Sequence, residues 1–317
     1  MSSGNRHHIS IALLALLTAC GPDDAMVDGV ARPIASLVAA ESLDRPDTVD
    51  VGSWNVEWLG AGDRGPTDEA LQLDHAATVL RTIDLDVVGI VEVVSETSFA
   101  DLVQSLPGRH GLIVTDPAVT GGREAYGDDE QKVALVLKDR FEVTAAHVVL
   151  DEESWSFAGR PPMEVSLSFF EGGRHRTLDV VVVHFKAMAN ADGYRRRTRA
   201  AAALQGWLAA EHARDWVLVV GDFNDDLDRS TYQARTSPFA ALLMDPAYRF
   251  TTQALTEAEI STTVHFSATI DHHLATASLA RRFVEDSAAV VRPDTWIARF
   301  GETTSDHYPV LTRYDLR

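Results

Sequence analysis

The sequence has little cysteine and little positive charge for its length. Its 317 residues include one cysteine, Cys20, so no disulfide can form within the chain. It carries 28 Lys and Arg against 47 Asp and Glu, a formal net charge of −19. Proteins that track a nucleic-acid backbone over their whole surface neutralise phosphates with Lys and Arg. The composition therefore argues against that class, but it allows an enzyme that handles phosphate at one local site.

The sequence also lacks internal repeats, a glycine-rich nucleotide-binding fingerprint and a cysteine-based zinc site. Hydrophobic residues make up 45% and charged residues 24%, which is typical of a globular chain. Strand and helix patterns alternate from about residue 49 onward with no clear break. We therefore expect residues 49–317 to form one domain.

Residues 1–19 have the organisation of an export signal, with Arg6 before an apolar segment at 9–17 that is short for a membrane span. The run Leu17-Thr18-Ala19-Cys20 resembles a bacterial lipobox, in which the cysteine is lipidated and becomes the N-terminus. The alternative is an ordinary signal peptide cut nearby. We expect a lipidated Cys20, a flexible tether through residue 48, and an exported, monomeric protein anchored to a membrane of the bacterial envelope, with simple secretion as the alternative.

Polar residues interrupt or end apolar runs at several places along the rest of the chain. They are Asn55, Glu92, His184 with Lys186, Asp222 with Asn224, Asp271, and Asp306 with His307. Apolar β-branched runs such as 177–183 and 216–220 predict buried strands. Carboxylates are rarely buried unless they are paired or bind metal, and α/β folds bind ligands at strand ends. These clusters therefore predict one shared site.

Residues 192–213 form the clearest predicted helix, with Asp192 as its cap. Its first turns carry several arginines, including Arg195 and Arg199. Cations at a helix N-terminus oppose the macrodipole, so these side chains either face a phosphate or form a solvated basic face. A short strand is expected at 280–284, before the final loop that carries Asp306.

The residue types of the predicted site suit metal-dependent phosphodiester hydrolysis. Asn55, Glu92 and Asp306 offer hard oxygen ligands for Mg²⁺, with Mn²⁺ or Ca²⁺ as alternatives. Asp222 can accept a proton from water, and Asn224 can orient water or phosphate. Charge on the phosphoryl oxygens can be stabilised by His184, His307, Lys186 and Arg160, with Asp271 orienting a histidine.

Each residue also has an ordinary structural explanation. Asn55 can form a turn, Glu92 can pair with an arginine, and Gly221-Asp222-Phe223-Asn224 can be a simple strand-to-loop turn. A His-Phe-Lys sequence such as 184–186 is more often surface than catalytic. It is the joint occurrence of these residues at the ends of apolar runs that favours function.

The motifs resemble those of the endonuclease/exonuclease/phosphatase superfamily, whose fold is deoxyribonuclease-I-like. The motifs that carry the resemblance are Trp54-Asn55-Val56-Glu57, Ile90-Val91-Glu92, Val183-His184-Phe185-Lys186, Gly221-Asp222-Phe223-Asn224-Asp225, Ile270-Asp271-His272 and Ser305-Asp306-His307-Tyr308-Pro309-Val310. The resemblance covers nearly all of residues 50–314, and Gly-Asp-Phe-Asn and Ser-Asp-His-Tyr-Pro-Val are its specific parts. It implies a four-layer α/β sandwich, that is, two mixed β-sheets flanked by helices.

The resemblance also implies roles. Glu92 and Asn55 would hold the metal with Asp306 nearby, and Asp222 would position or deprotonate a metal-held water with help from Asn224. His184 and His307 would bind the scissile phosphate, with Asp271 paired to His307. Arg160 resembles the phosphate-contacting arginine of the deoxyribonuclease branch. Where that branch has a glutamate beside the first histidine, this sequence has Gln131, next to Glu130.

The sequence leaves three hypotheses about the function: a nuclease, an enzyme for a small phosphoester or phospholipid headgroup, and a non-catalytic binding protein. The arginines at 195–199 and the run Ile270-Asp271-His272-His273 favour an exported nuclease acting on DNA or RNA, with Lys186, Arg195 and Arg199 contacting phosphate. The net charge favours instead a small phosphoester such as an inositol phosphate, or a phospholipid headgroup of the sphingomyelin type. A lipoprotein that binds without catalysis is the third. Trp155 beside Arg160 fits a lipid surface or a stacked nucleobase.

Overall fold

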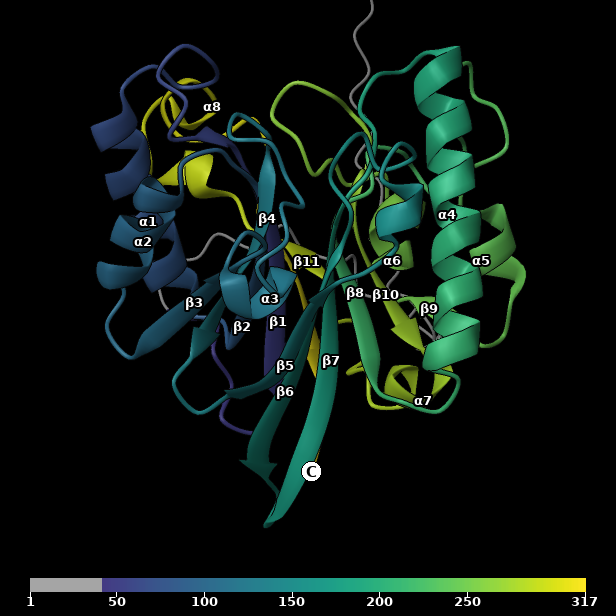
Figure 1. The fold of residues 1–317 in the computed structure, drawn as a ribbon. Helices are drawn as coiled ribbons and strands as arrows, with labels where there is room; N and C mark the ends of the chain where they lie inside the picture. The colour runs from purple at the N-terminus through teal and green to yellow at the C-terminus, as the bar shows by residue number, and fades with distance from the viewer. Residues whose placement is uncertain (1–41) are drawn as a thin grey trace, which may run out of the picture. The chain divides into compact units, whose positions relative to one another are not determined.

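Two six-stranded mixed β-sheets form the centre of the structure, a computed structural model that describes residues 42–317 (Figure 1). The first sheet has the order β11-β12-β1-β2-β4-β3 and consists of β1 (Val49–Leu59), β2 (Val87–Val93), β3 (Arg109–Ile113), β4 (Lys132–Lys138), β11 (Ala289–Val290) and β12 (Val310–Tyr314). The second has the order β5-β6-β7-β8-β10-β9 and consists of β5 (Glu142–Val148), β6 (Met163–Glu171), β7 (Arg174–His184), β8 (Val217–Asp222), β9 (Tyr248–Phe250) and β10 (Asp271–Thr276).

Helices and short helical turns connect the strands. They are α1 (Glu69–Ile83), α2 (Glu96–Gln104), α3 (Pro117–Thr120), α4 (Ala191–Glu211), α5 (Ala240–Met244), α6 (Gln253–Glu257), α7 (Ala277–Ala280), α8 (Phe300–Thr303) and the 3₁₀ turns η1 (Asp151–Glu153) and η2 (Pro293–Thr295). None of the helices in the described residues is long and apolar enough to cross a membrane.

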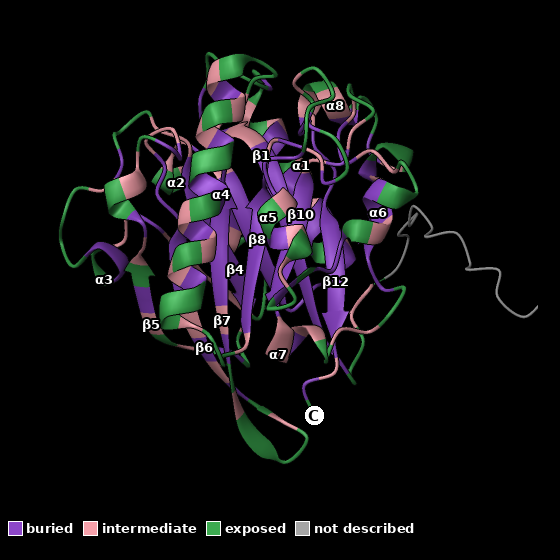
Figure 2. Cartoon of the chain, turned by 90° about the vertical axis from the view of Figure 1, so that its right-hand side faces the viewer, coloured by how far each residue is buried: buried purple, intermediate pink, exposed green. Residues whose placement is uncertain are grey.

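The apolar side chains form three layers that hold the elements together. Side chains from both sheets meet in the middle layer, for example Val87 and Leu135 against Val165 and Val220. The outer face of the first sheet packs on α1 and α2, and that of the second sheet packs on α4 and α5. The central strands are accordingly almost wholly buried, whereas exposed residues gather on the helices, the loops, the edge strand β5 and the tip of the β6–β7 hairpin (Figure 2). The predicted four-layer sandwich is confirmed.

Two local predictions were wrong. The long helix begins at Ala191 and its cap is Asn190, whose side chain accepts a hydrogen bond from the Gly193 amide at 2.8 Å. Asp192 lies in the first turn instead, where a carboxylate favours the positive end of the helix. Residues 280–284 form no strand, because the chain turns after α7 and only Phe283 bridges to Tyr314.

The predicted signal peptide, Cys20 and most of the predicted tether lie outside the described residues. Residues 42–48 of that tether contact the folded unit: the Leu43 amide donates to the Ile83 carbonyl at 3.1 Å, and Thr48 is buried. The domain boundaries otherwise stay a prediction.

Candidate active site

Strand register brings three predicted site residues onto one row. His184 at the end of β7 pairs with Asp222 at the end of β8, and Asp222 pairs with Asp271 at the start of β10. Residues that pair across neighbouring strands share a face of the sheet, so the three side chains lie side by side. The imidazole Nε2 of His184 lies 3.6 Å from the Asp222 carboxylate.

Gly221 allows this row to form. Its φ is +140°, and a Cβ placed on it would lie 2.0 Å from the Val183 carbonyl oxygen of β7. Only glycine tolerates so close a backbone approach. The glycine of the Gly-Asp-Phe-Asn motif therefore positions Asp222 against His184.

Asn55 and Glu92 reach the same place from the first sheet. The Asn55 side-chain amide donates to Glu92 at 2.9 Å and to Asp222 at 3.1 Å. Both strands are irregular at this point: the β1–β2 register shifts between Asn55 and Leu59, and Glu57, Trp58 and Glu92 have φ of +50°, +57° and +67°. Bulges of this kind re-aim side chains next to functional sites.

The loop before β12 completes the cluster. His307 Nδ1 lies 2.9 Å from the Asp271 carboxylate, and its Nε2 lies 3.9 Å from both Asp222 and Asp306. Ser305 fixes the loop, because its hydroxyl donates to the Asn55 carbonyl at 2.7 Å and accepts from the His307 amide at 3.0 Å.

Glu57 belongs to the site, although the sequence reasoning gave it no role. Its carboxylate accepts a hydrogen bond from the Asp306 amide at 2.9 Å. Burial, followed by the charges of Asp306 and Glu92, raises the pKa of the Glu57 carboxyl to about 7. Its place two residues after Asn55 was the available signal, but the bulge rather than strand alternation brings it to Asp306.

The two histidines differ in charge because their neighbours differ. Burial and the adjacent Arg160 guanidinium hold the pKa of His184 well below its usual range. Burial would also lower the pKa of His307, but the Asp271 carboxylate outweighs it and raises that pKa well above the usual value. The site therefore combines a neutral imidazole with an imidazolium at neutral pH.

Arg160 is buried beside His184. Its guanidinium donates to His184 Nδ1 at 2.9 Å and to the Phe185 carbonyl at 3.1 Å, and it also contacts the Gln131 side chain. Gln131 thus supports the arginine, and through it the histidine. The same guanidinium nitrogen lies 3.2 Å from His184 Nε2, and this Nε2 lies 3.6 Å from both the Glu92 and the Asp222 carboxylates.

Asp222 is hydrogen-bonded by Asn224 and lies beside the carboxylate of Asp271. Its carboxylate accepts from the Asn224 backbone amide at 2.7 Å and from the Asn224 side chain at 2.9 Å. Burial, followed by the charge of Asp271, raises the pKa of Asp222 to about 7. A carboxyl that titrates near neutrality is suited to accept a proton.

The acids and histidines also form groups that could hold a divalent cation. Two such groups lie here, Glu92 with His184 and Asp222, and Asp222 with Asp271 and His307. Glu57, Glu92 and Asp306 crowd together, since Asp306 raises the pKa of both Glu57 and Glu92 after the effect of burial. Crowded carboxylates with an amide oxygen nearby suit Mg²⁺ or a similar hard cation, which would relieve their repulsion.

The structure does not bring every predicted phosphate contact to the cluster. Arg195 pairs with Asp192 at 2.6 Å, and Arg199 forms two hydrogen bonds to Glu153 at 2.7 and 2.8 Å. Both are more than half exposed and have acidic partners. Lys186 lies two residues after His184 and has no acidic partner within 4 Å among residues 42–317, so it is the stronger of the predicted surface contacts.

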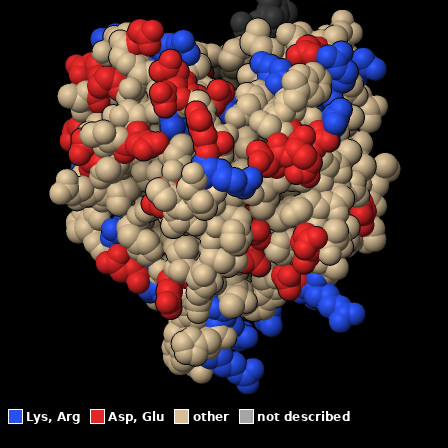
Figure 3. Space-filling view, in the orientation of Figure 1, with Lys and Arg blue, Asp and Glu red and all other residues tan. Residues whose placement is uncertain are grey.

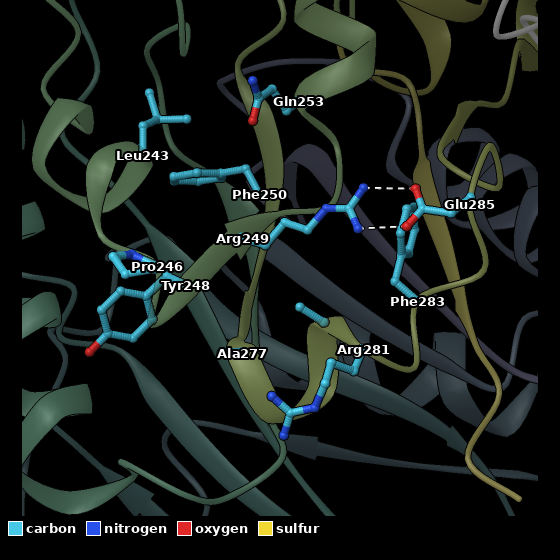
Figure 4. A pocket seen from close by; sticks show the side chains of 11 residues that line it. Leu243, Pro246, Tyr248, Arg249, Phe250, Gln253, Ala277, Arg281, Phe283 and Glu285 are labelled. Carbon is cyan, nitrogen blue, oxygen red and sulfur yellow. Dashed lines mark hydrogen bonds and ion pairs between the residues drawn. The ribbon is translucent and has the colours of Figure 1, made fainter. Parts of the chain in front are cut away.

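A spacious pocket lies away from this polar cluster. It has a volume of about 590 Å³ and is lined by residues of β9, α7 and their loops, including Tyr248, Phe250 and Phe283, with an Arg249–Glu285 ion pair across it (Figure 4). None of the predicted site residues lines it. We place the chemistry at the polar cluster, because the perturbed acids and histidines converge there.

A model of the endonuclease/exonuclease/phosphatase family matches residues 52–307. The chain belongs to this family. Members of the family are hydrolases that act on phosphoesters. A search of curated proteins finds no significant match.

Solved structures of the family share the fold of this chain at low identity. A humanized D. rerio TDP2 is 14% identical, with 84% of this chain and 99% of that chain covered and a TM-score of 0.59. An endonuclease/exonuclease/phosphatase from Bacteroides vulgatus is 17% identical, with 85% and 99% covered and a TM-score of 0.58. A Bacteroides thetaiotaomicron mannosyl-6-phosphatase is 16% identical, with 83% and 98% covered and a TM-score of 0.52. These likenesses support the deoxyribonuclease-I-like fold.

Proposed function

We propose that this protein is a divalent-metal-dependent phosphodiesterase, and specifically a nuclease that cleaves DNA or RNA internally. The observation that carries this proposal is the row His184, Asp222 and Asp271, faced by His307 and by Asn55 with Glu92. The row combines a proton acceptor, a neutral imidazole and an imidazolium around one point. A group that accepts a proton from water and groups that stabilise negative charge on the phosphoryl oxygens both accelerate the hydrolysis of a phosphodiester.

The chain's own residues would act as follows. Asp222, held by both donors of Asn224, accepts a proton from the attacking water. His307, kept charged by Asp271, stabilises negative charge on the phosphoryl oxygens, and His184 binds the phosphate while Arg160 holds its ring. Asn55, Glu57, Glu92 and Asp306 would hold the cation, which we propose is Mg²⁺. Bound there, the cation would polarise the phosphoryl group and balance its charge.

The proposal is tested on a panel of substrates. The purified protein is incubated with plasmid DNA, RNA, sphingomyelin vesicles and inositol phosphates, each with Mg²⁺ and with chelator. We expect cleavage of nucleic acid that depends on metal. Turnover of only the lipid or the inositol phosphate would assign the small-substrate alternative. No turnover of any of these with metal present would show that the protein is not such an enzyme.

Asp222→Asn tests the mechanism. The amide cannot accept the proton, so kcat should fall by about 10²- to 10⁴-fold. The fold should persist, because the amide keeps the size of the side chain and can still accept the hydrogen bond from the Asn224 backbone amide. Circular dichroism would check the fold, and a variant with the wild-type rate would remove Asp222 from this role.

We propose that the protein is exported and anchored through a lipid on Cys20. The support is the Leu17-Thr18-Ala19-Cys20 sequence, with Cys20 as the sole cysteine. Cys20→Ser should move the protein from the membrane fraction to the soluble fraction of cells. Unchanged membrane association would refute lipidation and leave the proposed chemistry untouched.

The fold itself does not choose the substrate. Among similar structures, one D. rerio TDP2 is complexed with a single-strand DNA product, whereas the Bacteroides protein named above is a mannosyl-6-phosphatase. The choice of nucleic acid rests instead on the cations beside the site.

A further inference from the structure

An exposed tryptophan stands at the edge of the site. Trp155 is 49% exposed and lies in the loop between β5 and β6, five residues before Arg160. Arg160 ends this loop with its guanidinium on His184, and Phe157 between them is buried against Phe185 at 5.2 Å between ring centroids. The loop that positions the catalytic arginine therefore also presents the indole.

The backbone that carries Trp155 is held by helix α4. Arg196 donates two hydrogen bonds to the Trp155 carbonyl, one of them at 2.8 Å from Nε. Arg199 donates two hydrogen bonds to Glu153, and the Ser156 hydroxyl donates to the same carboxylate at 2.8 Å. A loop fixed in this way loses little conformational entropy when a ligand binds to it.

A row of cations leads from His184 to this ring. The guanidinium carbons of Arg196 and Arg195 lie 4.8 and 5.6 Å from the Trp155 ring centroid. Burial, followed by the charges of Arg160 and Arg196, lowers the pKa of Lys186, and Arg196 itself pairs with Asp192 at 3.6 Å. The Lys186 ammonium has no ion pair within 4 Å among residues 42–317, and the buried Arg197 holds its carbonyl at 2.7 Å.

This row is local in an otherwise acidic chain of net charge −19. Figure 3 shows basic side chains gathered at the upper right, over the upper end of α4, whereas acidic side chains are spread over much of the same face. Cations arranged around an aromatic ring are the usual apparatus for holding single-stranded nucleic acid.

We propose that Trp155 stacks an unpaired nucleobase near the scissile phosphate, while Lys186 contacts the flanking phosphate, so that the preferred substrate is a single-stranded polynucleotide. The inference rests on the proposed nuclease function. A rigid duplex keeps its bases stacked inside, and it is bound through many phosphate contacts that residues 42–317 do not offer. A lipid surface would require apolar neighbours around the indole, whereas the neighbours of Trp155 are cations.

The test compares Trp155→Ala with the wild-type protein on two substrates. One is a short single-stranded oligonucleotide, and the other is bis(p-nitrophenyl) phosphate, which reaches only the catalytic cluster. We expect KM for the oligonucleotide to rise at least about fivefold, since stacking on an aromatic side chain contributes that much or more to binding. We expect kcat on the oligonucleotide and all parameters on the small diester to stay unchanged.

Two further variants separate stacking from folding. Trp155→Phe keeps a smaller ring and should raise KM less than Trp155→Ala does. Phe170→Ala removes another exposed aromatic ring, 63% exposed on the β6–β7 hairpin, and should behave as wild type on both substrates. Thermal unfolding of each variant is recorded beside the kinetics.

The possible outcomes distinguish failure of the stacking inference from failure of the proposed nuclease function. An unchanged KM for the oligonucleotide in Trp155→Ala would overturn the inference, as would an equal loss on the small diester or a loss confined to sphingomyelin vesicles. A wild-type protein that cleaves duplex and single strands equally well, with Trp155→Ala impaired on neither, would overturn it too. Failure of the wild-type protein on every phosphodiester would instead refute the proposed function.

Discussion

At the scale of single residues, the site shows how neighbours assign different tasks to identical side chains. His184 and His307 are both buried; burial together with Arg160 keeps the first neutral, whereas Asp271 outweighs burial and keeps the second charged. The sequence predicted both histidines and the Asp271 partner, because the motifs carry them at fixed places. It did not show that Gln131 supports Arg160, since that contact joins a loop before β4 to one before β6.

Gly221→Ala should destabilise the folded protein. The added Cβ would meet the Val183 carbonyl at 2.0 Å at a φ of +140°, so either β7 or β8 must shift. We expect the free energy of unfolding to fall by about 3 kcal/mol or more, measured by urea denaturation.

Gly206→Ala is the matched control for that substitution. Gly206 lies within α4 with no atom within 4 Å of a new Cβ, so alanine should stabilise the helix by about 0.5–1 kcal/mol. If both substitutions changed stability alike, the close approach of β7 and β8 at Gly221 would not be a constraint.

At the scale of elements, the regular parts of the strands were predictable and the irregular parts were not. Runs such as 177–183 are apolar and β-branched, so their burial on both faces follows from composition. The bulges at Glu57 and Glu92 arise where β1 and β2 lose register, which depends on pairing between segments far apart in the chain. Asn190 and Asp192 are both good caps, and only the helix's actual start distinguishes them.

A buried histidine, His273, links the two sheets through hydrogen bonds. His273 of β10 contacts the Thr312 hydroxyl of β12 at 2.7 Å and the Ser53 hydroxyl of β1 at 3.0 Å. Burial lowers the pKa of His273 from 6.5 to about 3. Below pH 6.5 the unfolded chain therefore binds a proton at His273 that the folded chain does not bind. The free energy of unfolding accordingly decreases as pH falls from 6.5 toward about 3.

The expected slope is up to about 1.4 kcal/mol of unfolding free energy per pH unit across that window. His273→Gln keeps a donor and an acceptor for the two hydroxyls but cannot titrate. Urea denaturation at a series of pH values should give a shallower slope for this variant, whatever its stability at neutral pH. Equal slopes for the two proteins would mean that His273 is not a source of acid sensitivity.

At the scale of the whole molecule, the charge of −19 opposes a polyanionic substrate while the cations beside Trp155 attract it. The long-range repulsion reaches about 30 Å at 0.01 M salt and about 10 Å at 0.1 M. Modest salt should therefore screen the repulsion before it weakens the local contacts. We expect KM for a long single strand to fall as NaCl rises from about 0.01 to 0.1 M, at fixed free Mg²⁺.

The small diester bis(p-nitrophenyl) phosphate, with a single charge, is the control and should show little change in KM over the same range. A KM for the polynucleotide that rises steadily with salt, as for ordinary basic nucleases, would show that the local cations dominate at all ionic strengths. The acidic surplus and the run of arginines at 195–199 were readable from the sequence, but the contacts of these arginines with Trp155 and Glu153 were not.

The arrangement of the sheets was expected from the family resemblance rather than from the residues. No pattern in residues 310–314 shows that β12 lies between β11 and β1, yet it pairs with both. Its neighbours in the chain, Asp306 and His307, enter the site only because β12 is anchored there.

That anchoring has a consequence for the order of events during synthesis. A nascent chain that has not yet emerged past Tyr314 already contains Asn55, Glu92, His184 and Asp222, but it has nothing to fill the position between β11 and β1. The proposed hydrolytic site would therefore stay incomplete until residues 310–314 have taken this position.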